Sequence, residues 1–108
     1  MNNPFARALS AALSLAIVSR QVSDQGEPIG FLYHEQADFL NDSGWRLFSG
    51  QESDEYANNP DNFQVLSLSE ILDENPEIAP LMQQSFGAWE WDDNTEQFTA
   101  VSDWQPKE

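Results

Sequence analysis

The stretch "DSGWRLFSGQESDEY" (42–56) places a short aromatic run between a turn and a series of acids. Within it, "WRLFS" (45–49) has the alternation of a β-strand, because Trp45 and Leu47 then share one side. The other side also receives a large apolar group, Phe48. Apolar groups on both sides are typical of a strand buried on both faces, so we expect this strand near the centre of a sheet.

Turn residues and further apolar runs extend the pattern in both directions. The tetrapeptide "NDSG" (41–44) predicts a turn before the central strand, and "DQGEP" (24–28) predicts another. The remaining strands are expected at 14–19, 29–33 and 63–67, with a hairpin formed by 86–91 and 96–101 around "DDNT" (92–95).

Short helical segments separate some of these strands. Asn3 and Pro4 form a good helix start, which predicts a helix over 4–12. Ser67 and Glu70 have the spacing of a capping box, so a helix is expected over 67–76, ending at a proline. Weaker helical segments are expected at 54–58 and 77–84. Strands and helices do not alternate strictly. We therefore predict an α+β fold: one small domain over 1–108, with a mainly antiparallel sheet and short helices packed on one face.

Composition narrows the class of partner. The 108 residues include nineteen acids and four bases, which gives a formal net charge of −15. Naked nucleic acid and anionic membranes are disfavoured, since both require basic residues. A basic protein is the partner that this charge would attract, although acidity that serves only solubility is an equal alternative. With 40% hydrophobic residues, the chain should fold by itself.

Residues able to perform catalysis or bind a metal are few. The chain has no cysteine and a single histidine, His34, so thiolate chemistry and the common zinc sites are excluded. The acid-rich segments 52–56 and 92–96 lack the spacing of a calcium loop and are expected to be solvated turns. We predict no catalytic residue, no metal and no cofactor.

Aromatic residues and acids are interleaved in the segment 35–77. It holds eleven acids, one base and five aromatic residues. Rigid aromatic anchors surrounded by charge are typical of protein interfaces. Trp45, Phe48 and Phe63 are expected in the core, whereas Tyr56, inside an acidic loop, is expected to be exposed. The predicted contact surface comprises Asp42, Glu52, Asp54, Glu55, Tyr56 and Asp61.

The N-terminus faintly imitates a secretory signal. One arginine precedes the apolar run 11–18, but no small-x-small cleavage site follows, and the run is too short to cross a bilayer. We expect a cytoplasmic protein, with export as the minor alternative.

Residues 18–91 resemble the immunity protein 33-like family of small bacterial proteins. The likeness is carried by "VSRQVSDQGEPIGFLYHE", by "DSGWRLFSGQESDEY" and by "NPDNFQVLSLSEILDENPEI". The family often has arginine where this chain has His34. The motif falls on Asp42, Ser43, Gly44, Trp45, Arg46, Phe48, Ser49, Gly50, Glu52, Glu55 and Tyr56.

The resemblance implies a cytoplasmic immunity protein of a polymorphic toxin system, which would bind and block a cognate toxin, often a basic nuclease. Two alternatives stay open at this stage. One is a small housekeeping or regulatory adaptor that recognises a ligand through the region of Trp45. The other is a metal-assisted hydrolase built on the acids.

Overall fold

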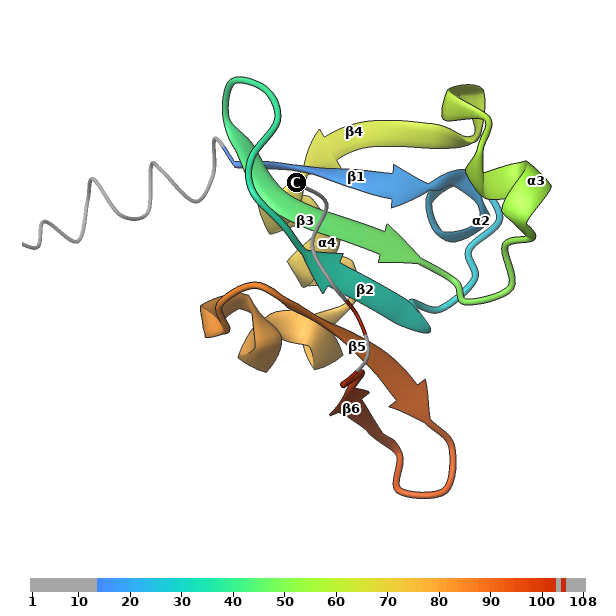
Figure 1. Cartoon of the computed structure of the whole chain (residues 1–108), viewed down its shortest axis with the longest axis vertical. Helices are drawn as coiled ribbons and strands as arrows, with labels where there is room; N and C mark the ends of the chain where they lie inside the picture. Colours follow the sequence, from blue (N-terminus) through green and yellow to red (C-terminus); the bar gives the residue numbers. More distant parts are fainter. Residues whose placement is uncertain (1–13, 103, 105–108) are drawn as a thin grey trace, which may run out of the picture.

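The computed structural model describes residues 14–102 and residue 104 (Figure 1). Within them, six strands form one sheet in the order β4-β1-β3-β2-β5-β6. The strands are β1 (Leu15–Ser19), β2 (Phe31–His34), β3 (Asp42–Phe48), β4 (Phe63–Ser67), β5 (Gly87–Asp92) and β6 (Gln97–Ala100).

The sheet is mainly antiparallel, as predicted, with one parallel pair, β1–β3. β3 pairs with β1 in parallel and with β2 in antiparallel orientation, so the strand expected to be central does have a neighbour on each side. The remaining three pairings are antiparallel, including the predicted β5–β6 hairpin. The α+β class and the mainly antiparallel sheet are therefore confirmed.

Helices α4 (Leu68–Glu74) and η2 (Pro76–Gln83) pack on one face of the sheet, behind it in Figure 1. Their Ile71 and Ile78 are buried against the inward side chains of β1, β2 and β3. The short α2 (Arg20–Ser23) adds Val22 to the same core. The buried core consists of Ala16, Val18, Ile29, Leu32, Trp45, Leu47, Ile71 and Ile78.

The opposite face of the sheet has no helix over it among the described residues. Strand registry places Phe48, Phe31 and Glu90 in one row across β3, β2 and β5 on this face, because paired residues project to the same side. We call this side of the sheet, with Phe48, Phe31 and Glu90, the helix-free face.

Helix α3 (Asp54–Ala57) and the turn η1 (Pro60–Asn62) lie beyond the end of β3, at one corner of the molecule (Figure 1).

Strand β3 begins three residues earlier than the sequence suggested. The turn predicted over 41–44 lies two residues earlier, over 39–42, where the Asp42 amide donates to the carbonyl of Phe39 at 3.0 Å. Gly44 lies inside the strand with φ +87°, and the β1–β3 registry shifts there: Leu15 pairs with Asp42, whereas Ile17 pairs with Arg46. This irregularity is a β-bulge, and glycine permits it because the left-handed region carries no steric penalty for it.

The predicted capping box is also wrong. Ser67 is the N-cap of α4, but its side chain makes no capping hydrogen bond and lies 3.0 Å from the hydroxyl of Ser69 instead. The helix expected over 4–12 falls outside the described residues. Of the apolar run 11–18, only the part from 14 onward is described, and 15–18 belong to β1. Among the residues that are described, no helix has the length and apolar character needed to cross a membrane.

Replacing Gly44 with alanine should destabilise the fold severely. An added Cβ would lie 2.1 Å from the carbonyl oxygen of Glu35, in addition to the strain of the left-handed backbone. Gly26→Ala is the matched control, since Gly26 has φ +73° but nothing within 4 Å. We expect a loss of about 1–2 kcal/mol for the control and at least about 3 kcal/mol more for Gly44→Ala, measured by urea unfolding. Equal losses would show that the bulge can relax.

Candidate protein-binding surface

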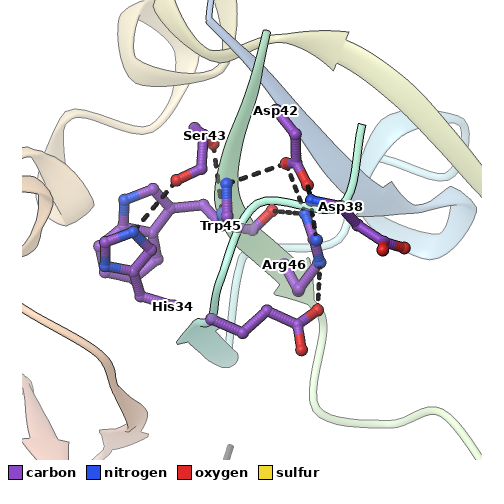
Figure 2. Close-up of polar contacts among 8 residues, drawn as sticks. His34, Asp38, Asp42, Ser43, Trp45 and Arg46 are labelled. Atoms are coloured by element: carbon purple, nitrogen blue, oxygen red, sulfur yellow. Dashed lines mark hydrogen bonds and ion pairs between the residues drawn. The ribbon is translucent and has the colours of Figure 1, made fainter. Parts of the chain in front are cut away.

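Arg46 is the centre of a buried ion-pair network on the helix-free face (Figure 2). Its Nη1 and Nη2 donate to the two carboxylate oxygens of Asp42, each at 2.8 Å, and its Nε donates to Glu35 Oε2 at 2.6 Å. The planar guanidinium matches this two-carboxylate arrangement in a way that an ammonium group cannot. The network fixes the loop 35–41 against β3.

Asp42 belongs to the interior and not to the surface. Its side chain is 0% exposed and also accepts hydrogen bonds from the amides of Gly44 and Asp38, at 2.8 and 2.7 Å. Burial alone would raise the pKa of Asp42, but hydrogen bonds from Arg46 and from these amides lower it on balance. All of its acceptor capacity is therefore used within the chain. The interpretation of Asp42 as an exposed contact has no support in this geometry.

Trp45 and His34 form a second fixed unit beside this network. Their rings stack with centroids 4.5 Å apart and an interplanar angle of 8°. The two ring nitrogens of His34 lie 3.1 Å from the carbonyl of Ser43 and 3.2 Å from the carbonyl of Gln84. Trp45 is 2% exposed, so a ligand cannot reach its ring from solvent. The adaptor hypothesis that placed a ligand at this tryptophan loses its structural basis.

Glu52 organises the loop that follows β3. Its carboxylate accepts from the amides of Ser49 and Gly50, at 2.8 and 3.0 Å, and lies 3.1 Å from the Ser49 hydroxyl. Burial alone would raise the pKa of Glu52, but hydrogen bonds from Ser19 and Ser49 lower it on balance. Half-buried Glu52 is thus primarily a structural anion that holds the chain where α3 begins.

The remaining predicted acids do gather at one place. Asp54 and Glu55 are exposed on α3, and Asp61 is exposed on η1. Tyr56 is half-buried rather than fully exposed, because its ring packs edge-on against Phe63 with centroids 6.2 Å apart. We call the three acids around Tyr56 the acidic corner. Ser53 caps α3 by accepting from the Tyr56 amide at 3.1 Å, which fixes the orientation of this short helix.

Aromatic side chains connect the acidic corner to the rest of the helix-free face. Phe63 contacts Phe48 at 5.6 Å, Phe48 stacks on Tyr33 at 5.7 Å, and Tyr33 contacts Trp104 at 5.4 Å, all as centroid distances. Phe48 and Phe63 are half-buried, so the prediction that they lie in the core is wrong: they cover the face opposite the helices. These rings, with Phe31 and Tyr56, form what we call the aromatic band.

A groove of about 930 Å³ opens at the end of the sheet where β3 ends and β2 begins. It shares Phe31 and Phe48 with the aromatic band and reaches α3 at Ala57. The groove was not predicted, because its walls come from segments that are far apart in the sequence. Its acidic lining residues are Glu52, Glu77, Glu90 and Asp93.

The described part of the chain offers neither a candidate metal centre nor an unpaired arginine. Residues 14–102 and 104 contain no group of three or more histidine or acidic side chains placed to hold a metal ion. Both arginines within this range, Arg20 and Arg46, are already paired with carboxylates. The surface that these residues present is therefore acidic and aromatic, without a free arginine.

Comparison with known proteins gives a family. The family model described as the Immunity protein Imm33 domain matches residues 16–102. No curated protein and no solved structure matches the chain significantly. Since the match covers most of the chain, the protein belongs to the Imm33 family, in agreement with the resemblance carried by the residues of the central motif.

Removing the guanidinium of Arg46 should cost far more stability than removing an exposed one. Arg46→Met would leave Asp42 buried and unpaired, and we expect a loss of about 3–5 kcal/mol in the free energy of unfolding. Arg46→Lys should be intermediate, since it keeps the charge without the fork of donors. Arg20→Met, in an exposed pair with Asp24, should cost about 1 kcal/mol or less. Similar losses for Arg46→Met and Arg20→Met would contradict the structural role of the network.

The lowered pKa values of Asp42 and Glu52 predict a component of stability that is lost in acid. A group with a lower pKa when folded stabilises the native state above its ordinary pKa, and this contribution is lost as the pH falls through the folded value. Glu52→Gln should therefore flatten the dependence of unfolding free energy on pH below about 4.5, compared with wild type. Glu70→Gln, at an exposed acid of α4, is the control. Parallel profiles for wild type and Glu52→Gln would refute the prediction.

Proposed function

We propose that this member of the Imm33 family is an immunity protein that binds a cognate toxin domain and blocks it by covering its functional surface. The observation that carries the proposal is the acidic corner: three exposed acids lie on α3 and η1, the same capped and hydrogen-bonded segment that carries Tyr56. The family match supplies the class of protein, and the corner supplies a place for contact.

The corner is well suited to a preorganised interface. The side-chain amide of Asn62 donates to the Tyr56 carbonyl at 2.9 Å, and the Asn59 side chain accepts from the Asp61 amide at 3.0 Å. These bonds fix the backbone between the acids, so little conformational entropy would be lost on binding. Tyr56, packed on Phe63 but still partly accessible, offers a rigid aromatic contact.

Charge determines the expected partner. The net charge of −15 would repel nucleic acid and anionic lipid, whereas a basic protein surface would be attracted over a distance of about one Debye length. A toxin that binds nucleic acid carries such a surface, and an acidic protein would compete directly for it. The proposal places this complex in the cytoplasm of the producing cell and requires no catalytic group on this chain.

Neutralising the acidic corner should slow association with the toxin domain encoded beside the gene for this chain. The variant Asp54→Asn/Glu55→Gln/Asp61→Asn should lower the association rate constant about fivefold or more at physiological salt. Growth of cells that express the toxin should then be protected less well. Stopped-flow association kinetics and a co-expression growth assay provide the two measurements.

The matched control is Glu70→Gln/Asp73→Asn/Glu74→Gln on α4, which removes the same three charges from the helix-covered side of the sheet. Association with this variant should stay within about twofold of wild type, because distant exposed charges are screened. An equal decrease of the association rate constant in both variants would show an effect of net charge alone. It would contradict the acidic corner as the contact site. Failure of the wild-type chain to form any complex with neighbouring gene products at low salt would overturn the proposed function itself.

A further inference from the structure

The groove at the end of the sheet contains carboxylates that no side chain of residues 14–102 and 104 pairs with. Glu77 lies in the first turn of η2, and Glu90 lies on β5. Within residues 14–102 and 104, neither side chain has a hydrogen bond or an ion pair. Asp93 accepts one hydrogen bond from the Trp91 indole at 2.8 Å. Glu52 is held by the Ser49–Gly50 amides, as described above. The four acids come from three separate segments, the loop after β3, η2 and the β5–β6 hairpin, and no basic residue is among the described residues that line the groove.

The walls of the groove are aromatic as well as acidic. Phe31 and Phe48 lie with ring centroids 5.8 Å apart, and Glu90 is the cross-strand partner of Phe31. Trp91 is 38% exposed and is steadied by its contact with Phe98 at 5.1 Å. At the floor, Gly30 fits because any Cβ would lie 2.2 Å from the Ser49 carbonyl. The groove thus combines flat apolar rings with negative charge in a space large enough for several side chains.

We propose that this groove receives an extended, arginine-bearing segment of the bound toxin. An arginine fits better than a lysine, because a guanidinium can stack on an aromatic ring and donate to a carboxylate at the same time. Charge complementarity selects this occupant, since the described residues that line the groove include unpaired carboxylates and no cation. The inference rests on the proposed function for the identity of the partner. It also goes further, because it names a second contact region and the chemistry of the side chain that occupies it.

The groove can be tested without the toxin by titrating the full chain with the peptide N-acetyl-Gly-Arg-Gly-amide and recording amide and indole NMR shifts. We expect saturable shifts at Gly30, Gly50 and the Trp91 indole. The same peptide with lysine in place of arginine should bind at least about fivefold more weakly. The peptide with citrulline in that place, which has nearly the same shape without the charge, should give no saturable shift.

The variant Glu77→Gln/Glu90→Gln should raise the Kd of the arginine peptide at least about fivefold. The control variant Glu70→Gln/Glu74→Gln on α4 should change this Kd by less than about twofold. Equal binding of the arginine and citrulline peptides, absence of any saturable shift, or shifts confined to α3 would each overturn the assignment.

The same variants then separate the groove from the proposed function. If the toxin domain binds wild type, Glu77→Gln/Glu90→Gln should raise its Kd at least about fivefold. An unchanged Kd would refute the role of the groove while leaving the immunity function intact. If no toxin binds at all, the proposed function fails and with it the toxin as the occupant. The peptide titration would then still decide whether the groove takes an arginine.

Discussion

The ion pair between Arg46 and Asp42 imposes the constraint on which the central strand depends. In a regular strand, residues four apart are separated by about 13 Å, so a direct contact between them would need an almost fully extended arginine. The bulge at Gly44 interrupts the regular strand between the two residues, and both guanidinium nitrogens reach the carboxylate at 2.8 Å. A buried charge pair of this kind is costly to break, since either partner alone would remain unsatisfied. The bulge, the ion pair and the folded loop 35–41 therefore require one another.

This arrangement separates the two faces of β3 by function. On one face, Trp45 and Leu47 join the core beneath α4 and η2. On the other face, Arg46 is paired with the carboxylates of Glu35 and Asp42. Phe48 packs against the rings of Phe31, Tyr33 and Phe63. Glu52 then fixes the exit of the strand through the Ser49 and Gly50 amides. The acidic corner and the groove both lie at this exit, so their geometry is set by the same strand that holds the core together.

The sequence predicts much of this fold, because alternation and turn residues are local signals. The central strand, the β5–β6 hairpin and the helices after β4 follow from residues close together in the chain. The role of Asp42 could not be predicted in this way: a spacing of four is typical of helical ion pairs, and in this strand the pair spans a bulge that has no clear local signal. Tyr56 and Phe63 are seven residues apart in sequence and meet through the intervening turn. The groove depends on strand registry, which places Glu90 beside Phe31 without any local sign.

A distinction among the acids follows from their environments. Asp42 and Glu52 have their oxygens saturated by donors of the same chain, and their charge serves folding. Asp54, Glu55 and Asp61 lie exposed at the acidic corner, and Glu77 and Glu90 line the groove without a partner among the described residues. A net charge as negative as −15 opposes the compact state through repulsion among all the acids. A cationic partner would relieve that repulsion and gain attraction in the same step. The acids without a partner are therefore the ones whose charge remains available to a partner, whereas the charge of Asp42 and Glu52 is already used within the fold.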